Sequence, residues 1–236
     1  MKLLNSLKIK IFADGANFDD ILSLNKKEFI KGFTTNPSLM KKAKIQNYEE
    51  FAKNLLSHIK DKPVSFEVFS DEIDEMEIQA EKIATWGKNV NVKIPITNTK
   101  NISTKELIHK LSQKGIICNI TAIFTLKQIK EVVEVLHNET PAILSVFAGR
   151  IADTGVDPVQ IIKESIDILE ENTLAEIIWA SPRELLNIFQ ASEIGCHIIT
   201  VTPDIINKMK LISYDLDEYS LDTVKMFYDD AVSAGY

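Results

Sequence analysis

Eight short apolar runs recur along the chain, and each is followed by a segment long enough for a helix. The runs are KIFAD (within residues 8–14), FIKGFTTN (29–36), VSFEVF (64–69), VNVKIP (90–95), IICNITAI (116–123), AILSVFAG (142–149), EIIWAS (176–181) and CHIITVT (196–202). Strands that alternate with helices indicate parallel βαβ units. Eight such units in about 200 residues predict a single (β/α)8 TIM barrel rather than an open doubly wound sheet.

Local signals predict where several helices begin. Capping-box spacing occurs at Ser103/Glu106, Thr125/Gln128 and Ser181/Glu184, and an N-cap precedes a first-turn proline at Asp157-Pro158 and Thr202-Pro203. The weakest helix signal lies in NFDDILSLNKK, between the first two runs. We expect one domain over residues 1–236, with residues 205–236 as a C-terminal helical extension. The last helix has no strand to cover, so we expect it to pack on the barrel or on a neighbouring subunit.

Composition narrows the function classes. The chain has 236 residues, 45% of them hydrophobic, and a formal net charge of −7, which argues against a general nucleic-acid or membrane-surface binder. No apolar run approaches the roughly 20 residues that span a bilayer, and MKLLNSLKIKIFAD is too short and too interrupted for a signal peptide. Cys118 and Cys196 fit two buried, reduced cysteines. We therefore expect a cytoplasmic protein, and we find no cluster of residues with the spacing of metal ligands.

Polar residues gather where the predicted strands end. They are Asp14, Thr34, Thr35, Asn36, Glu67, Lys93, Asn119, Thr121, Ser145, Arg150, Ser181 and Arg183. In a (β/α)8 barrel these ends meet at the face that carries the chemistry. Single members have simpler explanations, because Asp14, Asn36 or Ser181 could each cap a helix. Together they predict an active site at this face.

Lys93 stands out because it interrupts the two-residue alternation of Val90, Val92, Ile94 and Ile96. Burial disfavours a lysine ammonium and leaves more free amine, the form that attacks carbonyl groups. Schiff-base chemistry is therefore one interpretation. The alternatives are a structural ion pair with Glu67 on the preceding strand, or a register that points Lys93 outward.

Arginine is rare in this chain, since lysine outnumbers it by 25 to 2. Both arginines, Arg150 and Arg183, follow adjacent predicted strands. A planar five-donor guanidinium suits phosphate recognition. Together with Ser181 and the amides of a helix expected to begin at Pro182, the two arginines predict a phosphate or sulfonate site.

Four motifs in succession resemble the transaldolase family: TTNPS (34–38), VKIPIT (92–97), CNITAIF (118–124) and SVFAGRIAD (145–153). In length the chain is similar to the short subfamily, which includes fructose-6-phosphate aldolases. The resemblance implies no cofactor, sugar phosphates as substrates and a homo-oligomer, which is often ring-like in this subfamily.

The resemblance also implies roles for individual residues. It makes Lys93 the Schiff-base lysine and Asp14 the acid that moves the substrate hydroxyl proton. Glu67 would orient a catalytic water with Thr121. The substrate-binding positions are Asn36 and Asn119 for the donor's hydroxyls, Ser145, Arg150, Ser181 and Arg183 around the phosphate, and in addition Thr34 and Phe147.

Two positions favour group transfer over aldol cleavage. The aldolases of the subfamily have glutamine where this chain has Glu67, and tyrosine where it has Phe147. Three alternatives stay open: an aldolase that releases dihydroxyacetone, a related enzyme for a different anionic sugar, and a non-catalytic anion-binding barrel. The second is suggested by SPRE (181–184), where Pro182 and Glu184 depart from the family pattern.

Overall fold

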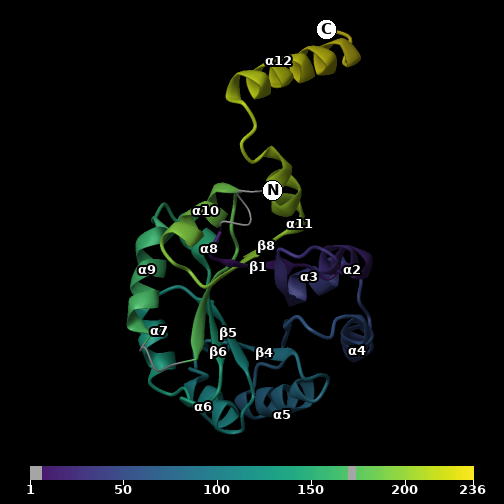
Figure 1. Ribbon diagram of the computed structural model, residues 1–236. Helices are drawn as coiled ribbons and strands as arrows, with labels where there is room; N and C mark the ends of the chain where they lie inside the picture. Colours follow the sequence, from purple (N-terminus) through teal and green to yellow (C-terminus); the bar gives the residue numbers. More distant parts are fainter. Residues whose placement is uncertain (1–6, 170–173) are drawn as a thin grey trace. The chain divides into compact units, whose positions relative to one another are not determined.

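Eight strands form a closed parallel barrel in a computed structural model, which describes residues 7–169 and 174–236. Each strand pairs with the next, and the last pairs with the first (Figure 1). The strands are β1 (Lys10–Asp14), β2 (Ile30–Thr34), β3 (Val64–Glu67), β4 (Val90–Pro95), β5 (Cys118–Ile123), β6 (Ala142–Val146), β7 (Ala175–Trp179) and β8 (Ile198–Val201). The (β/α)8 barrel with additional C-terminal helices is confirmed.

Helices follow every strand and cover the outside of the barrel, as α5, α6, α7 and α9 do in Figure 1. They are α2 (Phe18–Asn25), α3 (Pro37–Lys42), α4 (Tyr48–His58), α5 (Ile73–Ala84), α6 (Lys105–Gln113), α7 (Leu126–Val133), α8 (Ala148–Ala152), α9 (Pro158–Ile168), α10 (Leu186–Glu193) and α11 (Pro203–Lys208). The segment with the weakest signal does form a helix, α2, which Asn17 caps by accepting a hydrogen bond from the Asp20 amide.

The expected helix starts were right at three places and wrong at two. Thr125 and Gln128 form a reciprocal capping box, and α9 and α11 begin at their first-turn prolines. Helix α6 begins one residue later than predicted, with Thr104 as N-cap and no side-chain cap hydrogen bond. Helix α10 begins at Leu186 rather than at Pro182, and the reason lies in the loop described below.

The strand β4 is buried along both faces, which explains how it carries a lysine inward. Val92 and Ile94 are fully buried, and Lys93 between them is only 6% exposed. Successive side chains of a strand point to opposite faces. Because Lys93 is buried, the interpretation in which its side chain points to solvent is excluded.

The C-terminal part of the chain forms a separate compact unit. The contacts divide the protein into Met1–Ile206 and Asn207–Tyr236. The second unit contains a 3-10 helix, η1 (Met209–Leu211), and α12 (Leu216–Ser233), and none of the residues of α12, all of which are described, is buried. Within residues 7–169 and 174–236, no helix combines the length and the apolar character that crossing a membrane requires.

Candidate active site

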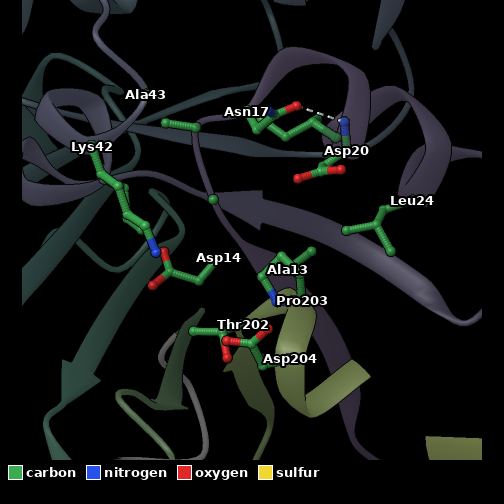
Figure 2. Close-up of a pocket in the computed structure, with 14 residues that line it drawn as sticks. Ala13, Asp14, Asn17, Asp20, Leu24, Lys42, Ala43, Thr202, Pro203 and Asp204 are labelled. Atoms are coloured by element: carbon green, nitrogen blue, oxygen red, sulfur yellow. Dashed lines mark hydrogen bonds between the residues drawn. The ribbon is translucent and has the colours of Figure 1, made fainter. Parts of the chain in front are cut away.

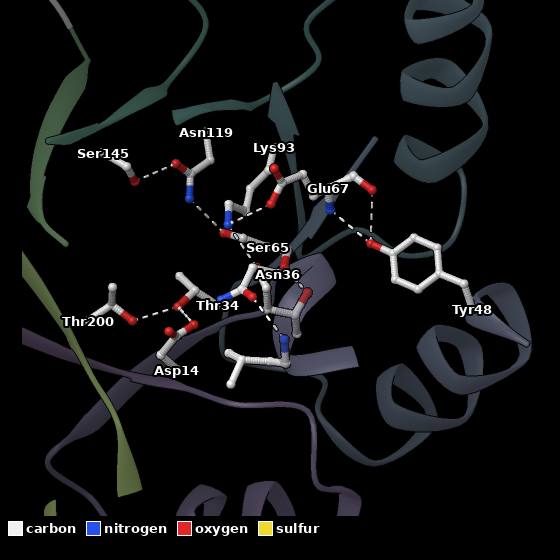
Figure 3. A network of polar contacts seen from close by, with 12 residues as sticks. Asp14, Thr34, Asn36, Tyr48, Ser65, Glu67, Lys93, Asn119, Ser145 and Thr200 are labelled. Carbon is white, nitrogen blue, oxygen red and sulfur yellow. Dashed lines mark hydrogen bonds and ion pairs between the residues drawn. The ribbon is translucent and has the colours of Figure 1, made fainter. Parts of the chain in front are cut away.

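Three polar side chains lie level with one another on adjacent strands. The β3–β4 register pairs Glu67 with Lys93, and the β4–β5 register pairs Lys93 with Asn119. Residues paired across parallel strands project from the same face of the sheet. Figure 3 shows the three side chains gathered together, with Asp14 and Thr34 nearby.

The Lys93 amine is held by two oxygen atoms. Its Nζ lies 3.0 Å from Glu67 Oε2 and donates a 2.8 Å hydrogen bond to the Thr35 carbonyl. Both side chains of the ion pair are largely buried, with 8% and 16% of their surface exposed. The ion pair proposed as the structural alternative is therefore present, and it places a carboxylate beside the amine.

Asp14, the last residue of β1, accepts the last hydrogen bond in a chain of hydroxyl groups. Thr34 Oγ1 donates to Asp14 Oδ1 at 2.8 Å, and the Thr34 and Thr200 hydroxyls are 2.6 Å apart. Because Thr34 uses its only proton on Asp14, Thr200 is the donor to Thr34. Burial raises the pKa of the Asp14 carboxyl above its ordinary value, while the Lys93 charge and the Thr34 hydrogen bond both act to lower it.

Asn119 links three strands. Its Nδ2 donates to Ser65 Oγ at 3.0 Å, and its Oδ1 accepts from Ser145 Oγ at 2.7 Å. Thr121, two residues further along β5, is also buried. Asn36 lies at the start of α3 and caps it, since its Oδ1 accepts from the Leu39 amide at 3.0 Å. The capping alternative is thus realised for Asn36, whereas α2 is capped by Asn17 and not by Asp14.

The predicted phosphate residues lie beyond β6 and β7. Arg150 is exposed on α8, with its guanidinium carbon 5.6 Å from the centre of the Phe147 ring. Phe147 is half-buried, packs against Phe124 at 5.7 Å and contacts the barrel core. Arg183 forms a two-pronged ion pair with Asp153, and this contact lowers the pKa of the Asp153 carboxyl. Asp153 would therefore compete with a bound anion for Arg183.

The loop between β7 and α10 corrects the expected helix start. The amides of Arg183 and Glu184 both donate to Asn187 Oδ1, at 2.8 and 3.1 Å. Ser181 adopts a left-handed conformation with φ of 59° and does not cap a helix. Since Asn187 already occupies these two amides, they do not form the open helix N-terminus that the phosphate prediction assumed.

A cavity of about 330 Å³ adjoins Asp14 (Figure 2). Its walls come from the end of β1, from α2 and α3, and from the start of α11. Lys42, Asn17 and Asp204 are among its polar residues. Cavities of this size hold small organic ligands, so there is space for a small molecule beside Asp14.

Comparison with known proteins adds an independent finding. A family model described as "Transaldolase/Fructose-6-phosphate aldolase" matches residues 11–235. This chain belongs to that family.

Relatives of this family member share about a third of its residues. A "Probable transaldolase" from Thermoanaerobacter sp. (strain X514) is 33% identical over 218 residues, which cover 92% of this chain and 95% of the relative. One from Clostridioides difficile (strain 630) is 34% identical over 224 residues, covering 94% and 98%. A crystal structure of a Burkholderia cenocepacia J2315 protein is 12% identical with a TM-score of 0.59 over 85% of this chain and 78% of that one, which supports the fold alone.

Sequence reasoning missed three side chains of this transaldolase-family site. Tyr48 contacts the backbone of Glu67, Thr200 donates to Thr34, and Asp153 holds Arg183. Thr200 could have been found, because it lies near the end of the last apolar run. Asp153 lies inside the SVFAGRIAD motif, but no sequence pattern assigns its partner 30 residues away.

Proposed function

We propose that this protein is a transaldolase that transfers a dihydroxyacetone unit from a ketose phosphate to an aldose phosphate through a Schiff base on Lys93. The observation that carries the proposal is the buried Lys93 amine, 3.0 Å from Glu67 at the carboxyl ends of the barrel strands. A (β/α)8 barrel places its chemistry at this face. A buried amine with an adjacent proton carrier suits Schiff-base formation.

The first half of the reaction builds the Schiff base. The Lys93 amine adds to the ketose carbonyl carbon, and the carbonyl oxygen takes up a proton to give the carbinolamine. Glu67, acting through a water held with Thr121, supplies and removes protons as the carbinolamine loses water and becomes the iminium. The hydrogen bond to the Thr35 carbonyl helps to orient the amine for the first attack.

The second half moves the three-carbon unit. Asp14 removes the proton of the C4 hydroxyl, the C3–C4 bond breaks, and its electron pair passes to the iminium nitrogen to leave an enamine on Lys93. The aldose phosphate departs, another enters, and the same steps run in reverse. Hydrolysis of the iminium then releases the new ketose and restores the amine. Burial of Asp14 makes its carboxylate a stronger base than an exposed one.

Two side chains, Glu67 and Phe147, favour transfer over the runner-up, an aldolase that releases dihydroxyacetone. Release requires protonation of the enamine, and the phenyl ring of Phe147 has no proton to give. That ring is held by Phe124 and by the core beneath it. The enamine on Lys93 is therefore expected to react with an aldehyde rather than to be protonated.

For the phosphate we propose the corner formed by Ser145, Ser181, Arg150 and Arg183. A dianion would have to draw Arg183 away from Asp153, to which it is paired. Because Asp153 competes for Arg183, we propose that the sugar phosphate is bound mainly by Arg150. The same competition also fits the alternative in which the enzyme takes a different anionic sugar.

The test of function is a product assay with and without an acceptor. Fructose 6-phosphate with erythrose 4-phosphate should yield sedoheptulose 7-phosphate, which is detected by mass spectrometry. Fructose 6-phosphate alone should give little free dihydroxyacetone. If dihydroxyacetone were released without acceptor as fast as it is transferred with acceptor, the aldolase would be favoured. No reaction with either mixture, combined with turnover of another anionic ketose, would favour the different-sugar alternative.

The acid limb of the pH profile should report Asp14. Because burial raises the pKa of this carboxyl above 3.8, kcat should fall with decreasing pH at a midpoint above that value. Thr34→Val removes a hydrogen bond that lowers this pKa, so the midpoint should move to higher pH. The control is Thr85→Val, which deletes a hydroxyl bonded to the Lys82 carbonyl on α5. A midpoint that stays in place or moves to lower pH in Thr34→Val would contradict the assignment of Asp14.

We further propose a single barrel domain with residues 205–236 as a helical extension, a cytoplasmic location and a ring-like homo-oligomer. The free thiols of Cys118 and Cys196 support the location. Large apolar side chains exposed along α12 support the oligomer; they include Leu216, Val224, Phe227, Tyr228 and Val232. A monomeric mass by light scattering would contradict the oligomer.

A further inference from the structure

The backbone pairing between β2 and β3 stops short of the active site. The Phe33 amide donates to the Pro63 carbonyl at 2.9 Å, and the Thr35 amide donates to the Ser65 carbonyl at 3.2 Å. Each step of a parallel ladder advances both strands by two residues. The next step would bring residue 37 to the carbonyl of Glu67, and the Glu67 amide to the carbonyl of Thr35.

Neither of these two hydrogen bonds is made. Residue 37 is a proline, which has no amide proton to donate. The Thr35 carbonyl instead accepts from Lys93 Nζ at 2.8 Å. The interruption of the ladder therefore makes a backbone carbonyl available to the lysine, and it leaves the amide and the carbonyl of Glu67 in need of other partners.

The hydroxyl of Tyr48 replaces both missing partners. The Glu67 amide donates to Tyr48 Oη at 2.8 Å, and Tyr48 Oη donates to the Glu67 carbonyl at 3.1 Å (Figure 3). The ring is wedged between aromatic neighbours, with centroids 4.5 Å from Phe69, 5.4 Å from Trp86 and 6.0 Å from Phe66. Burial raises the pKa of Tyr48, so the hydroxyl keeps the proton that it donates.

We infer that Tyr48 is a positioning residue for the Lys93–Glu67 pair, a role that rests on the function proposed above. Without the hydroxyl, the Glu67 amide has one nearby acceptor in the ladder, the Thr35 carbonyl. That carbonyl already holds the Lys93 amine, so an amide drawn to it would shift the end of β3, and with it the Glu67 carboxylate, toward the amine's anchor. Tyr48 holds the end of β3 at Glu67 by both backbone groups, and it thereby maintains the position of the Glu67 carboxylate relative to the Lys93 amine.

Tyr48→Phe tests the inference, because it removes the hydroxyl and keeps the ring. The matched control is Tyr214→Phe, which deletes a hydroxyl bonded to Asp222 at 2.6 Å in the C-terminal unit. Each protein is mixed with fructose 6-phosphate, quenched with borohydride at set times and weighed intact. The rate constant for adduct formation should fall roughly 10- to 100-fold in Tyr48→Phe, the size expected for a small misplacement of reacting groups. It should be unchanged in Tyr214→Phe.

Rate constant and final amount separate positioning from general destabilisation. A purely structural role would lower the folded fraction and hence the final amount of adduct, with the rate constant unchanged, and this result would overturn the inference. So would equal rate constants for Tyr48→Phe and wild type. If wild type itself forms no adduct with any ketose tried, the proposed function fails as well, so the two failures are distinguishable.

A second measurement begins with the wild-type protein, so its first result does not depend on how well the variant folds. Hydrogen exchange of the Glu67 amide in the wild-type protein should be slow, because Tyr48 Oη accepts its proton. Exchange at the rate of a free amide would overturn the inference. Where Tyr48→Phe is folded, the Glu67 amide should exchange at least about 10-fold faster than in wild type, because the variant lacks the hydroxyl that accepts its hydrogen bond.

Discussion

Lys93→Ala is expected to abolish the adduct that borohydride traps from fructose 6-phosphate, and to lower kcat by a factor on the order of 10⁴ or more. No other group in the proposed mechanism forms a covalent bond to the substrate. In the wild-type protein, intact-mass spectrometry and peptide mapping should place a dihydroxyacetone adduct on Lys93. The control is Lys100→Ala, which removes an exposed lysine paired with Glu72 at 2.6 Å.

The same substitution leaves the Glu67 carboxylate largely buried without its counter-charge. Breaking such a pair costs about 3 kcal/mol or more, so lost activity could be confused with lost folding. The double variant Lys93→Met with Glu67→Gln removes both charges at similar volume, and it should recover most of the stability and none of the activity. An adduct on a different lysine, or a trapped adduct in Lys93→Ala, would contradict the assignment.

Gly149→Ala is expected to have the largest effect on stability. A Cβ at this position would lie 1.5 Å from the Ser181 carbonyl oxygen and 2.7 Å from its carbonyl carbon. The neighbouring backbone has little freedom to retreat, because Ser181 is already left-handed and the Gly149 amide donates to the Ala180 carbonyl at 3.3 Å. We expect a loss of more than about 4 kcal/mol, among the largest effects of single substitutions.

Thermal denaturation checks this expectation, because such a loss should lower the Tm of a protein of this size by roughly 10 °C or more. Gly15→Ala is the matched control, since a Cβ there meets nothing within 4 Å and its backbone is not left-handed. The control should melt within a few degrees of wild type, because such a change costs at most about 1 kcal/mol. If Gly149→Ala melted at the same temperature as Gly15→Ala, the close approach of Gly149 in α8 to Ser181 would be wrong.

The barrel was predictable because each strand carries its own signal. The run at 90–95 coincides with β4, and its alternation marked Lys93 as an interruption, although the burial of Lys93 came from the structure. Thr125 and Gln128 formed the capping box that their spacing predicted. These are local patterns, in which the residues that decide the structure lie within a few positions of one another.

The same local reasoning failed where a competing partner came from elsewhere. Ser181 and Glu184 have capping-box spacing, yet the Arg183 and Glu184 amides both donate to Asn187. The Glu184 amide is the one that a capping box would have bonded to Ser181. The two arginines were expected to offer a free anion site, but Asp153 holds Arg183. In both places a side chain outside the pattern satisfied the group on which the prediction depended.

The sequence by itself determined the fold class and the strands that carry Lys93, Glu67 and Asn119, because strand periodicity is a local pattern. The register that brings these three side chains level came from the structure. Only the tertiary structure decided how those groups are held. Tyr48 reaches Glu67 from the start of α4, 19 residues earlier in the chain, and Lys93 reaches the Thr35 carbonyl across 58 residues. A hydrogen bond between distant residues requires a specific approach in space, and that approach exists only after the barrel has closed.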